Sequence, residues 1–191
     1  MELQHINVKL YLRDPHAVKM EAVVPVFHDW IQHRACEELL IDVADYRHVH
    51  AGPGVVLIGH QADYSFDNTD SRLGIRYNRK AVVEGSNRNR FSQALRAACR
   101  ACQKLESDEK LGGTVCFDGR GIQLFVNDRI LAPNRAHLAE AVGTELREFF
   151  ADALGSSEFE MRFERDPRRL FGAEVTAAKP LELGDLLERL N

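Results

Sequence analysis

Three consecutive segments of this sequence carry polar side chains of the types used in acid–base chemistry. With a loop at 51–54 between the first two segments, Asp45 lies opposite His60 in an antiparallel pair. A turn at 67–70 then places His60 opposite Tyr77. An aspartate beside a histidine fixes the imidazole tautomer and raises its basicity, and a tyrosine hydroxyl can donate a hydrogen bond. The pairing therefore predicts a group of Asp45, His60 and Tyr77 on one face of a sheet.

Two arginines next to this group indicate what it would bind. Arg47 and Arg79 each carry a guanidinium, which matches the geometry of a carboxylate or a phosphate, so we expect a small anionic ligand. In this hypothesis His60 is a base or hydrogen-bond partner, Asp45 orients it and Tyr77 is a donor. The same residues also suit a hydrogen-bonded core network with the arginines at the sheet edge, and this interpretation stays open. A register shift of one residue would move every one of these side chains to the opposite face.

Hydrophobic patterning predicts the elements that must position these residues. Strands are expected at 6–12, 39–50, 55–64, 73–83, 114–117, 122–127, 159–163 and 174–177. Helices are expected at 25–34, 86–106, 133–154 and from 180 onward. Strands joined by short turns form an antiparallel meander, so we expect an α+β fold with an antiparallel sheet and helices packed mainly on one face. We expect one compact domain over 1–191, and the order of elements indicates similar halves at 1–111 and 112–191.

Local signals support two of the helices and argue against a redox site. Ser86 has the side chain of an N-cap, and Gly155 suits the end of a helix. Cys99 and Cys102 have the spacing of a redox pair. They fall well inside the expected helix, however, away from the N-terminal dipole that would lower a thiol pKa. We therefore expect small, buried core thiols.

A second chemical pattern is the His48-x-His50 pair, whose imidazoles lie on the same side of an extended strand. Metal sites use such spacing, but a metal ion needs a third and usually a fourth ligand. Asp63 is on the same expected face but far along the ladder. Exposed histidines near a turn are the commoner explanation, and a metal site at this pair is the third hypothesis.

Charge is distributed unevenly along the chain, whose net charge is −4. Residues 72–104 hold nine basic side chains against the single acid Glu84, a local charge of +8. Aromatic residues are sparse in this segment, so nucleic acid is not the expected partner. Arg96, Arg100 and Lys104 recur every four residues and should share one helix face.

That basic face supports a different class of function, a non-catalytic module that forms a homo-oligomer. Its second surface would be the C-terminal helix, which is rich in leucine: Leu183, Leu186, Leu187 and Leu190. Where the first hypothesis predicts ligand binding, this alternative predicts that copies of the chain assemble through their basic, acidic and apolar surfaces.

Composition limits the setting in which the protein works. Four cysteines in 191 residues do not form a disulfide framework and indicate reduced thiols in the cytoplasm. The N-terminal residues lack a charged region followed by an apolar region, so we expect no secretory signal. No apolar run approaches the ~18 residues of a membrane span. No motif indicates a particular cofactor or reaction.

Overall fold

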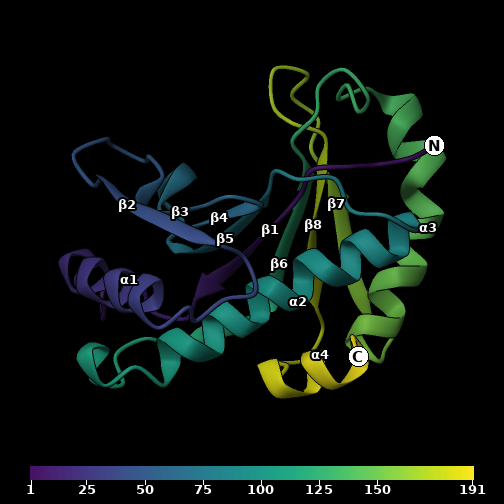
Figure 1. The fold of residues 1–191 in the computed structure, drawn as a ribbon. Coiled ribbons are helices and arrows are strands. Elements are labelled where there is room, and N and C mark those ends of the chain that lie inside the picture. Colours follow the sequence, from purple (N-terminus) through teal and green to yellow (C-terminus); the bar gives the residue numbers. More distant parts are fainter.

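The computed structural model describes all 191 residues and contains one antiparallel sheet of eight strands. Across the sheet the strands follow the order β2-β3-β4-β5-β1-β6-β8-β7, and every neighbouring pair is antiparallel (Figure 1). The strands are β1 (Ile6–Leu12), β2 (Leu40–Tyr46), β3 (Gly54–Gly59), β4 (Ala62–Asp67), β5 (Gly74–Arg79), β6 (Phe117–Val126), β7 (Phe159–Phe163) and β8 (Gly172–Ala177).

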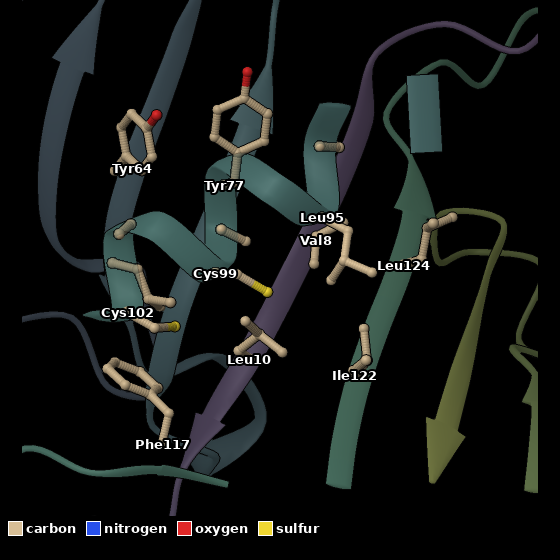
Figure 2. Close-up of a cluster of buried hydrophobic side chains, with 14 of the residues drawn as sticks. Val8, Leu10, Tyr64, Tyr77, Leu95, Cys99, Cys102, Phe117, Ile122 and Leu124 are labelled. Carbon is tan, nitrogen blue, oxygen red and sulfur yellow. The ribbon is translucent and has the colours of Figure 1, made fainter. Parts of the chain in front are cut away.

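Four α-helices pack against the sheet, and they lie mainly on one side of it (Figure 1). They are α1 (Val23–Gln32), α2 (Asn87–Glu106), α3 (Ala136–Leu154) and α4 (Leu183–Arg189). The long helix α2 crosses the middle of the sheet over β1 and β5. Its Leu95 and Cys99 lie beside Val8 and Leu10 of β1, in the centre of the hydrophobic core (Figure 2). The predicted α+β fold, with an antiparallel sheet and helices packed mainly on one face, is confirmed.

The two halves of the chain have a similar order of elements but differ in the number of returning strands. In the first half, β1 leads through α1 to β2, and the meander β2 to β5 returns until β5 pairs with β1. In the second half, β6 leads through α3 to β7, and β8 returns to pair with β6. In both, the first strand is parallel to the strand that follows the helix, and the returning strands fill the space between them. The halves meet where β1 pairs with β6.

The expected strand at 55–64 is wrong, because a tight turn divides it. Residues His60 and Gln61 form this turn between β3 and β4. A side chain on Gly59 would place its Cβ 2.4 Å from the carbonyl oxygen of Ala62, so the chain can reverse this closely only with glycine there. The apolar run on both sides of the turn conceals it, because hydrophobic periodicity does not detect a turn between two buried strands.

The expectation of two separate strands at 114–117 and 122–127, joined by a turn, is also wrong, since Phe117–Val126 is one strand, β6. Gly119 and Gly121 suggested a turn, but they lie at an irregularity where the β1–β6 register shifts between Leu10 and Tyr11. At Gly119 a Cβ would lie 2.0 Å from the carbonyl oxygen of Leu181. Glycine within a strand here marks a bulge and a close backbone approach rather than a reversal.

The local helix signals are confirmed. The Ser86 side chain accepts a hydrogen bond from the backbone N–H of Asn89 at the start of α2, and Gly155 ends α3 with φ 63°. Cys99 and Cys102 are both fully buried, and burial raises the pKa of the Cys99 thiol to about 12. These thiols are core residues, as expected. The helices expected to begin at Pro133 and Pro180 begin three residues later, at Ala136 and Leu183.

The C-terminal helix α4 is part of the core and not a free apolar surface. Leu183, Leu186 and Leu190 are buried, and α4 packs against α2 and α3. The apolar surface that the oligomer hypothesis assigned to this helix is therefore already covered within one chain. No helix of the structure combines the length and the apolar character needed to cross a membrane.

Replacing Leu186 with alanine tests this placement. Leu186 is 0% exposed, so we expect Leu186→Ala to lower the free energy of unfolding by about 3 kcal/mol. Leu187→Ala, on the same helix but only partly buried, is the matched control and should cost clearly less. Chemical unfolding followed by circular dichroism measures both, and equal small losses would contradict the packing described for α4.

Candidate functional site

The predicted catalytic group is not assembled. Asp45 pairs with Val55 and not with His60, which is exposed in the turn between β3 and β4. Asp45 and Arg47 lie at the exposed end of edge strand β2 and bind each other, with Arg47 Nη2 at 2.6 Å from Asp45 Oδ2. The predicted pairing is wrong because the connection between β2 and β3 spans residues 47–53 and not 51–54, which shifts the register by five residues, and because His60 itself lies in a turn. Any role of these three residues in a ligand site stays a prediction without geometric support.

Asp45 and Arg47 instead form a surface ion pair. Hydrogen bonds from the Arg47 side chain and backbone lower the pKa of Asp45 to about 2. The Asp45 carboxylate is therefore ionised, and its charge is balanced by the Arg47 guanidinium. It is not placed to polarise the distant imidazole of His60.

Tyr77 and Arg79, the other two predicted residues, do lie together, beside a carboxylate that the sequence did not single out. The Tyr77 hydroxyl donates to Glu38 Oε1 at 2.9 Å, and the Tyr64 hydroxyl donates to Glu38 Oε2 at 2.7 Å. Arg79 Nη1 lies 3.8 Å from Glu38 Oε1. Glu38 is only 7% exposed, so this carboxylate is a buried charge supported by two hydroxyls and a nearby guanidinium.

The two tyrosines come from neighbouring strands whose registry places them side by side. Tyr64 of β4 pairs with Tyr77 of β5, and their ring centroids are 5.1 Å apart (Figure 2). Burial, followed by the charges around them, raises the pKa of both hydroxyls well above the ordinary value for tyrosine. Both hydroxyls therefore remain protonated donors to Glu38 at neutral pH.

A pocket of about 370 Å³ opens beside this carboxylate, between α2 and the segment that follows α1. We call it the Glu38 pocket. It is lined by Ala35, Cys36, Glu37, Glu38, Tyr64, Gln93, Arg96, Ala97, Arg100, Ala101 and Lys104. Gln93 connects α2 to the carboxylate, because its Nε2 donates to the Tyr77 hydroxyl at 2.8 Å.

Two polar atoms of the pocket lining are buried and have no hydrogen-bond partner. They are Gln93 Oε1, an acceptor, and Arg96 Nε, a donor. In the whole molecule only one other residue, Asn7 on β1, has side-chain polar atoms in this condition. Because an unpaired buried polar atom costs about 1–3 kcal/mol, such atoms are rare and mark places where a partner is expected.

The basic residues of α2 form the rim of this pocket. Arg96, Arg100 and Lys104 all line it, as their spacing of four predicts. Arg100 forms an ion pair with Glu37, whereas Lys104 has no carboxylate partner. The rest of the basic segment does not form one patch, because its members pair with separate acids, for example Arg88 with Asp152 and Arg90 with Glu2.

Cys36 is the one thiol in the pocket, and its surroundings make it unreactive. Burial raises the pKa of the Cys36 thiol to about 12, and the nearby Glu38 acts in the same direction. The thiolate is the nucleophilic form, so a thiol with this pKa does not serve as a nucleophile at neutral pH. The pocket therefore offers hydrogen bonds and charge, not covalent chemistry.

Sequence reasoning missed Glu38, Tyr64 and Gln93. Glu38 belongs to a short polar segment after α1, where nothing in the pattern separates a buried carboxylate from an exposed one. Tyr64 would have been recognised as the direct neighbour of Tyr77 if the connection between β4 and β5 had been placed at 68–73 and not at 67–70, because this register pairs the two tyrosines.

The histidine pair offers no metal centre. His48 and His50 are exposed in the loop after β2, and no group of three or more His, Cys, Asp or Glu side chains is arranged to hold a metal ion. The third hypothesis therefore has no geometric support.

Comparison with known proteins does not assign the chain to a family. A scan against protein-family models finds no match, and a search of curated proteins finds no significant relative. The functional argument therefore depends on the site alone.

The tyrosine pKa shifts predict how stability responds to alkali. The pKa of Tyr64 is higher in the folded state than in the unfolded chain. The protonated hydroxyl therefore makes its full contribution to the free energy of unfolding below about pH 10, and this contribution is lost as the pH rises further. Tyr64→Phe should therefore reduce the fall in unfolding free energy above pH 10 by about 1.4 kcal/mol per pH unit. Chemical unfolding at several pH values measures this slope.

Tyr46→Phe is the control for this measurement, because Tyr46 is partly exposed on edge strand β2 and makes no contact with Glu38. An alkaline slope for Tyr64→Phe equal to that of the wild type would contradict the buried, Glu38-bound hydroxyl.

Proposed function

We propose that the protein binds a small anionic ligand in the Glu38 pocket. The observation that carries the proposal is the pair of unpartnered buried atoms, Gln93 Oε1 and Arg96 Nε, in one pocket beside a carboxylate whose own partners are in place. The class of ligand is the one expected from the sequence, but the site is different. Tyr77 and Arg79 contact Glu38 from outside the pocket lining, and the direct contacts with the ligand would come from the lining residues.

The charge of the lining favours an anion. Its acids are Glu37, which pairs with Arg100, and Glu38, which accepts from both tyrosines. Arg96 and Lys104 have no carboxylate partner, so positive charge on the α2 side of the pocket is uncompensated. A carboxylate or phosphate seated there would gain charge-assisted hydrogen bonds, which are about twice as strong as neutral ones.

The side of the pocket formed by Gln93 and Glu38 requires a hydrogen-bond donor on the same ligand. Gln93 Oε1 needs a donor, and Glu38 uses one lone pair of each oxygen for the tyrosines, so both can accept from a hydroxyl or an amine. A molecule with an anionic end and a donor a few ångströms away, such as a hydroxy or amino acid, meets both demands. The volume of about 370 Å³ lies within the ordinary range for small-molecule sites.

Binding is tested with malate and glutamate as probes, which carry an anionic group together with a hydroxyl or an ammonium. We expect each to raise the melting temperature of the wild-type protein, because a ligand that binds only the folded state stabilises it. Arg96→Gln should weaken binding at least ~10-fold in isothermal titration, the factor that corresponds to one charge-assisted hydrogen bond.

The matched control is Arg88→Gln, which changes an arginine on the same helix that pairs with Asp152 outside the pocket. This variant should bind as the wild type does. No thermal shift with either probe, or an Arg96→Gln variant that binds as well as Arg88→Gln, would contradict a ligand site in the Glu38 pocket.

A further inference from the structure

The face of the sheet turned away from the helices contains a second cleft, unrelated to the Glu38 pocket. Its volume is about 430 Å³. The floor is formed by strands on both sides of β1, and one wall by the loops that follow β6 and β7, which lie close together at one end of the sheet (Figure 1). Arg129 joins these loops by donating to the Arg168 carbonyl, and Asn134 donates to the Asp166 carbonyl. We call this the open-face cleft.

The floor of the open-face cleft contains a buried ion pair. Lys9 Nζ lies 2.5 Å from Asp67 Oδ1, and the two side chains are 3% and 0% exposed. Asp67 also accepts from the backbone N–H of Thr69 at 3.1 Å and from its hydroxyl at 2.9 Å. Asp67 is therefore almost fully engaged by Lys9 and Thr69, and the pair is neutral.

Arg76 adds a positive charge that this arrangement does not compensate. It pairs with Lys9 across the β1–β5 ladder, so two cations lie directly opposite each other, which is unfavourable. Its only ionic contact in the molecule is 3.8 Å long, to Asp67 Oδ2, and its side chain is only 24% exposed. Burial lowers the pKa of the guanidinium, but an arginine remains charged at neutral pH.

Arg72, a neighbour on the same face, shows what is missing at Arg76. Arg72 stacks on the Tyr11 ring at 3.8 Å, and its Nη1 lies 2.7 Å from Glu174 Oε1. Arg76 stacks on the Phe125 ring at 4.5 Å in the same manner, yet no carboxylate is within hydrogen-bonding distance of it. An aromatic ring holds each guanidinium in place, but only Arg72 has an anion.

The remaining lining increases the positive charge of the cleft. Arg129 and Arg162 line it as well, and their only hydrogen bonds go to a backbone carbonyl and to the exposed Glu160. Arg168 and Arg169 are paired with acids of the neighbouring loops. Of the basic side chains in the lining, Arg76 and Arg129 are the two without a carboxylate within hydrogen-bonding distance.

We propose that the open-face cleft binds a phosphate monoester, with the phosphoryl group on Arg76. A dianionic group matches the two guanidinium groups of Arg76 and Arg129, and the planar guanidinium presents paired donors to phosphate oxygens. The Phe125 ring, over which Arg76 lies, gives the organic part of the ester an apolar surface. This site is on the opposite face of the sheet from the Glu38 pocket, so it is independent of the function proposed there.

Titration of ¹⁵N-labelled protein with phenyl phosphate at low ionic strength tests the proposal, because salt screens exposed charges. We expect the backbone amide signals of Lys9, Arg76 and Gln123 to shift, while those of the Glu38 pocket on α2 stay in place. Arg76→Gln should weaken binding at least ~10-fold. Its melting temperature without ligand should equal or exceed that of the wild type, since the like-charge contact with Lys9 is removed.

Arg47→Gln is the control, since Arg47 is a paired arginine just after the edge strand β2, outside the cleft. It should bind phenyl phosphate as the wild type does. If Arg76→Gln does not fold, Arg76→Lys decides, because it keeps the charge and loses the paired donors, and it should still bind more weakly. Signals that shift only on α2, or unchanged affinity in the Arg76 variant that folds, would overturn the proposal.

Discussion

The packing of α2 across the middle of the sheet is the interaction on which the rest of the structure depends. The apolar stripe of α2 covers β1 and β5, where side chains such as Val8, Leu10 and Leu95 are fully excluded from water. Burial of apolar surface contributes about 25 cal/mol per Å², so this contact stabilises the centre of the fold. Because it uses one face of the sheet, it leaves the other face to polar residues, and it aligns the polar face of α2 with the pocket beside Glu38.

Alternation along β5 connects both candidate sites to this packing. Tyr77 points to the helical face and donates to Glu38, whereas Arg76, one residue earlier, points to the open face and lies over Phe125. One strand therefore places an uncharged donor in a buried network and an uncompensated cation in a cleft. Polar groups on both sides depart from what stability alone would favour, since a buried polar atom without a partner lowers stability. This is the physical reason for locating ligands at these two places.

Much of the fold follows from periodicity, whereas the predicted site depended on where the chain turns between strands. The strand at 6–12, the helix that begins after Ser86 and the stop at Gly155 were predicted from local patterns and are present. Tyr77 and Arg79 were also expected close together, and both lie beside Glu38, because the third strand of the meander was placed in the right phase. The position of His60 was wrong, because the turn that contains it is flanked by apolar residues on both sides. The connections at 47–53 and 68–73 are also longer than the expected 51–54 and 67–70, and each changes the register of the two strands that it joins.

The sequence by itself determined the fold class, the main helices and the alternation of faces on β5, because these depend on spacings of two and about four residues within one segment. It also indicated that Arg96, Arg100 and Lys104 share a helix face. Only the tertiary structure decided that Glu38 joins Tyr64 and Tyr77, and that Arg76 lacks the anion that Arg72 has. These contacts join residues far apart in the chain, and they arise from strand registry and from how α2 lies on the sheet, which no local spacing encodes.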